Sequence, residues 1–187
     1  MKDLTKKAIS TALRDLLLEK PINKISISDI TEKAGVNRQT FYYHFRDIID
    51  LLEWIFLEEE EKAIGDIKHF DTWQEAFLNI FMYFKKNKPY VMNLYKNIPL
   101  DMLNRYLYEL VYPIIFSVVD EKSQEYIVND DDIKFIVDFY MYAFVALVEN
   151  WIKDGMEEDP KKIIDRLSIL LKGTIDHSLT NLGKRKK

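Results

Sequence analysis

The chain has 187 residues, enough for one large domain or two smaller ones, and 48% are hydrophobic, as in a globular protein with a core. It contains no cysteine, which excludes disulfides, thiolate zinc sites and a cysteine nucleophile. The net charge of −4 argues against a protein that coats nucleic acid without sequence preference. The N-terminus lacks the apolar segment of a signal peptide, and no apolar run reaches the ~20 residues that span a membrane, so we expect a cytoplasmic protein without a membrane partner.

Apolar residues recur at helical spacing over nearly the whole chain, and strand-like alternation is scarce, so the sequence predicts an all-α protein. Glycine and proline are rare, with five of each, and most fall where a helix can begin or end. Pro113 lies inside an expected helix and should kink or split it. We expect about nine helices, at residues 4–19, 27–34, 38–44, 47–63, 71–87, 89–96, 99–120, 130–154 and 160–181.

The stretch KISISDI, residues 24–30, alternates like a strand, but we interpret it as the start of a helix. Ser26 and Asp29 have the spacing of a capping box, in which each side chain binds a free backbone N–H. Gly35 can adopt the left-handed conformation that ends a helix, and Asn37 can cap the next one. The sequence therefore predicts two short helices joined by a tight turn.

The second short helix, residues 38–44, has two different faces. On a helical wheel Phe41, Phe45 and Ile48 face the core, while the opposite face carries hydrogen-bonding groups and no acid. This is the layout of a helix-turn-helix, whose second helix enters the major groove, where Arg can bind guanine and Gln adenine. A merely solvated polar face has the same spacing, so the spacing alone leaves both interpretations open.

The charge distribution agrees with an N-terminal DNA-binding region. Residues 1–50 hold nine Lys or Arg and seven Asp or Glu, so the acidic excess lies in the rest of the chain.

The segment ISISDITEKAGVNRQTFYYHFRDIIDLL, residues 25–52, resembles the DNA-binding region of the tetracycline-repressor (TetR) family of bacterial transcription regulators. The resemblance extends over about residues 5–52 and includes the capped helix, the Ala-Gly-Val turn and the Thr-Phe-Tyr-x-His-Phe run. It implies a helix-turn-helix domain of three helices at residues 1–50, followed by a helical ligand-binding and dimerisation domain at 51–187.

The same resemblance implies a set of DNA contacts. Arg38, Gln39, Thr40 and Tyr42 match base- and phosphate-contacting positions, and Tyr43 and His44 match backbone contacts. Ser26 resembles a capping residue whose hydroxyl also meets a phosphate. Many members have Lys where this chain has Ile48, so either Arg46 supplies that charge or the contact is missing. The expected DNA-binding residues are Ser26, Asn37, Arg38, Gln39, Thr40, Tyr42, Tyr43, His44 and Arg46.

The segment IVDFYMYAFVALV, residues 136–148, carries one charge, Asp138, and is apolar nearly all round. Such a helix must be covered on all sides, by the core and, we expect, by a second subunit. The TetR-family interface is a four-helix bundle of the last two helices of each subunit, so the resemblance implies a two-fold homodimer that reads a palindromic operator in double-stranded DNA. A well-covered monomer core remains the alternative.

The expected function is a transcriptional regulator, in this family more commonly a repressor, whose operator binding is changed by an effector in the C-terminal domain. The effector, a small molecule or a partner protein, is not identified by the sequence. The LLEWIF segment, residues 51–56, resembles a subgroup related to the activator of the dihydroxyacetone-kinase operon, in which the effector can be a partner protein. An activator, or a helical interaction module that has lost DNA binding, therefore stays open.

We expect no enzyme, cofactor or metal, since the three histidines are widely separated and no glycine-rich phosphate loop is present. Several aromatic residues could line an effector cavity, although aromatic residues at helical spacing are more often plain core. These residues are Trp73, Phe77, Phe81, Phe84, Tyr95, Tyr106, Tyr140 and Phe144.

Overall fold

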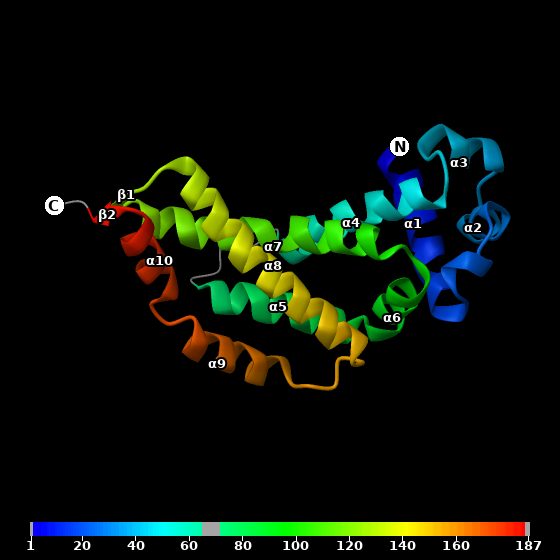
Figure 1. Cartoon of the computed structure of the whole chain (residues 1–187). Coiled ribbons are helices and arrows are strands. Elements are labelled where there is room, and N and C mark those ends of the chain that lie inside the picture. The colour runs from blue at the N-terminus through cyan, green and yellow to red at the C-terminus, as the bar shows by residue number, and fades with distance from the viewer. Residues whose placement is uncertain (1, 65–71, 186–187) are drawn as a thin grey trace. The chain divides into compact units, whose positions relative to one another are not determined.

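The computed structural model describes residues 2–64 and 72–185, and in these ranges it confirms the all-α class (Figure 1). Two short strands pair antiparallel, with Tyr126 opposite Arg185 and Ile127 opposite Lys184. The elements are α1 (Lys2–Glu19), the 3-10 turn η1 (Ile22–Lys24), α2 (Ile27–Ala34), α3 (Arg38–His44), α4 (Ile48–Ile64), α5 (Trp73–Lys86), α6 (Lys88–Asn97), α7 (Leu100–Ser123), β1 (Tyr126–Ile127), α8 (Asp130–Lys153), α9 (Pro160–Leu170), α10 (Thr174–Leu182) and β2 (Lys184–Arg185).

The predicted helix boundaries agree with the structure to within about three residues except near the C-terminus. The helix expected at 160–181 is two helices, because the chain leaves α9 at Leu171 and Gly173 adopts a left-handed φ of 74° before α10. The start expected at residue 71 lies outside the described residues, and α5 begins at Trp73. Of the two outcomes expected at Pro113, a kink or a split, the split does not occur, because α7 continues through this residue. Proline removes one backbone hydrogen bond, and four buried neighbours stabilise the helix around it: Leu110, Val111, Ile114 and Ile115.

The first of two compact units comprises Met1–Lys62 and Asn87–Leu103. Its core is formed by the apolar stripe of α1, including Ile9 and Leu13, together with Ile30, Phe41 and Leu51, each fully buried. This unit is larger than the domain expected at residues 1–50, because it also includes α4 up to Lys62 and α6, which packs against α1 and η1.

A single side chain of α6, Asn93, joins that helix to the end of α1. Its Nδ2 donates to the carbonyl oxygens of Leu17 at 2.6 Å and Lys20 at 2.9 Å. Its Oδ1 accepts from the backbone N–H of Ile22 at 3.2 Å. The amide therefore satisfies backbone groups that the end of a helix leaves without partners.

Replacing Asn93 by Ala is expected to lower the free energy of unfolding of the first unit by about 1–3 kcal/mol, because it leaves these part-buried backbone groups without partners. Chemical denaturation followed by circular dichroism measures the change. Asn79→Ala, which truncates an exposed asparagine of α5, is the matched control. Equal stability of the two variants would contradict a role for Asn93 in holding α6 on α1.

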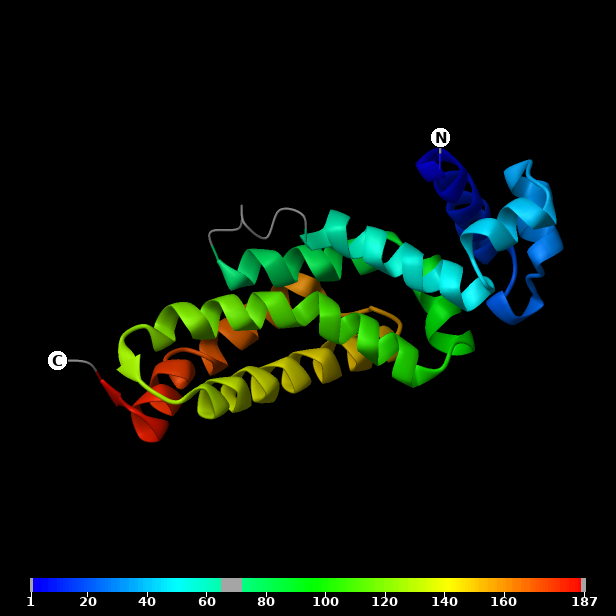
Figure 2. The same cartoon turned by 90° about the horizontal axis from the view of Figure 1, so that it is seen from above.

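The second unit comprises Ala63–Lys86 and Asn104–Lys187. In it α8 runs antiparallel to the part of α7 that follows residue 104, as Figure 2 shows. Aromatic rings connect α8 to its neighbours. Phe144 stacks on Phe77 of α5 with ring centroids 4.1 Å apart, and Tyr142 meets Tyr108 of α7 edge-on with centroids 5.5 Å apart. The core of this unit is therefore built around α8.

By length and composition α8 is also apolar enough to cross a membrane, with a mean hydropathy of 1.4 over its most apolar window. This differs from the expectation that no segment reaches that threshold. Half of the window is buried inside the protein, as in the core helix of a globular domain.

Candidate DNA interface

The start of α2 is fixed by the predicted capping box. The Ser26 backbone N–H donates to Asp29 Oδ2 at 2.7 Å, and the Asp29 N–H donates to Ser26 Oγ at 3.2 Å. The Ser26 hydroxyl also donates to Asp29 Oδ2 at 2.8 Å. The capping prediction is confirmed, and the hydroxyl proton of Ser26 is directed at Asp29.

Two ion pairs that the sequence analysis missed add to this cap. Lys20 Nζ lies 3.0 Å from Asp29 Oδ2, and Lys33 Nζ lies 2.6 Å from Glu19 Oε1, so each pair joins α2 to the end of α1 or the residue after it. Their partners are nine and fourteen residues apart, a spacing that helical periodicity does not reveal.

The hydrogen bonds from Ser26 and the ammonium group of Lys20 lower the pKa of Asp29 from 3.8 to about 2. The carboxylate is therefore expected to stabilise the first unit above pH 3.8, and this contribution is lost as the pH falls from 3.8 towards 2. Asp29→Asn should unfold more easily than the wild type above pH 3.8, and the difference should shrink over that interval. Thermal unfolding at several pH values measures it, with Asp101→Asn, an exposed carboxylate of the same unit, as control. A difference independent of pH would contradict the assigned cause.

The turn between α2 and α3 depends on Gly35, as predicted. Gly35 ends α2 with φ 68°, a left-handed conformation that side chains other than glycine rarely adopt. The N–H of Val36 then donates to the carbonyl oxygen of Thr31 at 3.0 Å and closes the turn. This turn determines the angle at which α3 leaves α2.

Helix α3 is held at its start by Asn37 and along one side by two phenylalanines. Asn37 Oδ1 accepts from the backbone N–H of Thr40 at 2.7 Å and from its hydroxyl at 3.0 Å. Phe41 is 0% and Phe45 3% exposed. The predicted core face is therefore confirmed for both rings, while Ile48 is only half-buried.

The opposite face of α3 is exposed and carries most of the predicted contact residues. Arg38, Gln39, Tyr42 and Tyr43 are exposed, whereas Thr40 and His44 are half-buried. The rings of Tyr43 and His44 meet edge-on at 4.9 Å. The structure thus brings guanidinium, amide, hydroxyl and imidazole groups together on one acid-free helix surface.

Arg46 follows α3 and has a structural partner. Its backbone N–H donates to Asp50 Oδ2 at 2.8 Å, and its guanidinium donates to Asp50 Oδ1 at 3.2 Å. The backbone N–H contributes most to lowering the pKa of Asp50, and Asp50 raises the pKa of Arg46. The Arg46 side chain remains 82% exposed, so its other N–H groups can still reach a phosphate.

In the described part of the chain, no group of three or more His, Asp or Glu side chains is placed to hold a metal ion.

Two sequence profiles match the chain. The profile of the bacterial regulatory proteins of the tetR family matches residues 9–55, and the profile "Transcriptional regulator C-terminal region" matches residues 71–173. A relative from Lactococcus lactis subsp. lactis, the HTH-type dhaKLM operon transcriptional activator DhaS, is 30% identical over 155 residues, which is 81% of each chain.

Solved structures show the same fold. The structure named dihydroxyacetone kinase operon activator DhaS superposes with a TM-score of 0.73 at 25% identity and covers 92% of this chain and 97% of its own. A TetR transcriptional regulator from Streptococcus agalactiae gives 0.60 at 22% identity, covering 98% and 96%. The TetR family repressor AlkX from Dietzia gives 0.57 at 16% identity, covering 92% and 95%. With the matched profiles and the DhaS relative, these results show that the chain is a DNA-binding transcriptional regulator that belongs to the TetR family.

Proposed function

We propose that this regulator binds a palindromic operator as a homodimer and represses transcription until an effector in the second unit changes its affinity for DNA. The acid-free surface of α3, held by Phe41 and Phe45, is the observation that supports operator reading. A cytoplasmic location and the lack of catalytic activity belong to the same proposal.

Activation is the second candidate, because the Lactococcus relative is named an operon activator. Transcription in vitro from the promoter of the protein's own gene distinguishes the two, since a repressor lowers the transcript yield and an activator raises it. We expect lower yield, and higher yield would replace repression with activation.

The exposed residues of α3 and Arg46 after it suggest two kinds of DNA contact, to base edges and to phosphates. Arg38 and Gln39, in its first turn, are proposed to contact base edges, with Thr40 and Tyr42 beside them. Tyr43, His44 and Arg46 are proposed to contact phosphates. Asn37 would use its Nδ2, which capping leaves available, whereas a contact from Ser26 requires its hydroxyl to turn away from Asp29.

The homodimer is supported by exposed apolar side chains on α8 and on α9. One side of α8 is buried against its own unit, while Phe135 and Phe139 are 68% and 61% exposed. Such large exposed apolar side chains commonly mark a protein–protein contact. We call this set the α8–α9 surface: Phe135, Phe139, Tyr142, Leu147, Ile169 and Leu170.

Fluorescence anisotropy with duplex DNA from upstream of the protein's own gene, against scrambled competitor and at two salt concentrations, tests operator binding. Binding that resists the competitor and weakens steeply with salt is expected. Equal, weak binding to both duplexes would contradict a sequence-specific regulator and favour an interaction module.

Replacing Arg38 by Ala is expected to weaken operator binding by about 1–3 kcal/mol and to relax the preference at one base position, because a guanidinium that bonds a base edge is lost. The same anisotropy assay on a set of single-base operator variants measures both effects. Arg185→Ala, which removes an exposed arginine of β2 in the second unit, is the control. Unchanged operator affinity and unchanged base preference would show that Arg38 does not contact a base.

A further inference from the structure

The second unit contains a partly open cavity of about 360 Å³, within the range of sites for small molecules. Its walls come from the first turn of α5, the second half of α7, the middle of α8, and the chain from the end of α9 into α10. Of the aromatic residues predicted for an effector cavity, Trp73, Tyr140 and Phe144 line it.

One side of this cavity is aromatic and apolar. The ring centroids of Trp73 and Phe144 are 5.8 Å apart in an edge-on contact, and the Phe144 ring also stacks on the ring of Phe77. Ile115 and Val118 of α7 extend the apolar lining. Because these rings are already packed against one another, they present a preformed aromatic surface against which a planar apolar group can pack.

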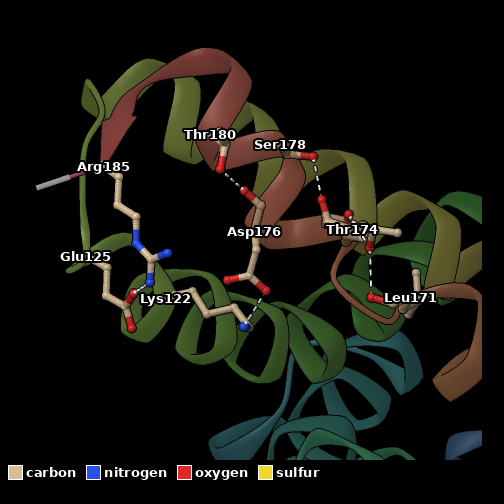
Figure 3. Close-up of polar contacts among 9 residues, drawn as sticks. Lys122, Glu125, Leu171, Thr174, Asp176, Ser178, Thr180 and Arg185 are labelled. Atoms are coloured by element: carbon tan, nitrogen blue, oxygen red, sulfur yellow. Dashed lines mark hydrogen bonds and ion pairs between the residues drawn. The ribbon is translucent and has the colours of Figure 1, made fainter.

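The charged side chains in the cavity lining are Lys122, Lys172 and Asp176. Lys122 Nζ and Asp176 Oδ2 are 2.7 Å apart and join α7 to α10, as Figure 3 shows. Lys172 is exposed and forms no ion pair with any described residue. The lining therefore carries two cations against one carboxylate, so it favours an anion.

Two hydrogen bonds connect the start of α10, the helix that carries Asp176, to its neighbours. Tyr140 Oη donates to Thr174 Oγ1 at 2.9 Å, and Thr174 Oγ1 donates to the carbonyl oxygen of Leu171 at 3.0 Å (Figure 3 shows the second of these bonds). Lys122 can thus exchange Asp176 for another anion while the hydrogen bonds of Tyr140 and Thr174 keep the start of α10 in place.

We propose that this cavity is the effector site and that its ligand is a small molecule with a flat apolar body and one anionic group. The body lies against Trp73 and Phe144, and the anion binds Lys172 and competes with Asp176 for Lys122. Its role as an effector rests on the proposed function, because the signal would pass from the α7–α10 contact to operator binding.

Two probes of the same shape test the charge preference on the full-length protein. Naphthalene-2-carboxylate carries the anion, and naphthalene-2-carboxamide is its neutral counterpart; the anisotropy of naphthalene fluorescence reports binding of either. The carboxylate is expected to bind about tenfold more tightly, as a charge-assisted hydrogen bond allows. Equal affinity, or no binding of either probe at millimolar concentration, would overturn the proposal.

Three variants locate the site. Lys172→Met should weaken binding of the carboxylate probe about tenfold and leave binding of the carboxamide probe unchanged. Asp176→Asn should strengthen carboxylate binding, because it removes the competitor for Lys122. Lys162→Met, an exposed lysine of α9 outside the lining, should change neither. If Lys172→Met and Asp176→Asn both behave like this control, the anion does not bind in the cavity.

Operator binding of the same preparation, measured without probe, separates this proposal from the proposed function. If the protein binds the carboxylate probe selectively but does not bind its operator specifically, the proposed function is rejected and the anion site in the cavity stands. If it binds the operator specifically but does not distinguish the two probes, the anion site is rejected and the proposed function stands. Charge-selective binding that leaves operator affinity unchanged would reject the effector role.

Discussion

Replacing Phe139 by Glu is expected to convert the proposed dimer to a monomer and to lower operator affinity by about 10²–10⁴-fold. Phe139 is 61% exposed on α8, beside the exposed rings of Phe135 and Tyr142. A carboxylate at this position would have to lose its hydration at an apolar interface. When the dimer dissociates, each recognition helix binds alone, and the gain from engaging two half-sites at once is lost.

Sedimentation equilibrium gives the mass, expected to be twice the 22.3 kDa chain for the wild type and equal to one chain for the variant. The anisotropy assay then gives operator affinity. Met82→Glu is the control, since Met82 is 50% exposed on α5 of the same unit and outside the α8–α9 surface. A Phe139→Glu variant that stays dimeric would place the interface elsewhere.

The features that the sequence predicted best are those determined by neighbouring residues. The caps at Ser26 and Asn37 each bind a backbone N–H three residues away, and both are present. Gly35 ends α2 through its own φ. The core face of α3 follows from helical spacing alone, because Phe41 and Phe45 are one turn apart.

Features that depend on distant segments could not be predicted in the same way. Asn93 bonds backbone groups more than 70 residues away, and Lys122 and Asp176 are 54 residues apart. The local rule for Pro113 predicts a kink or a split, and burial of its neighbours keeps α7 from splitting there. The cavity likewise needs α5, α7, α8 and α10 to meet, so its aromatic residues could be named as candidates but not separated from the core.

Replacing Phe41 by Ala is expected to lower the free energy of unfolding of the first unit by about 3–5 kcal/mol, the usual cost of truncating a buried phenylalanine. Phe41 is 0% exposed, and its ring centroid lies 5.7 Å from that of Tyr42 and 5.9 Å from that of Phe45. Helix α3 has seven residues, too few to persist without packing. The loss of this ring should therefore release α3 and with it specific DNA binding.

Tyr42→Ala separates the two roles of this helix. Tyr42 is 57% exposed, so its truncation should change stability by no more than about 0.5 kcal/mol while weakening operator binding. Thermal unfolding followed by circular dichroism should show an earlier transition only for Phe41→Ala, and sedimentation should show that both variants remain dimeric, since the α8–α9 surface belongs to the other unit. An unchanged transition for Phe41→Ala would mean that packing of this ring does not hold the recognition helix. Loss of the dimer as well would mean that the two units do not unfold separately.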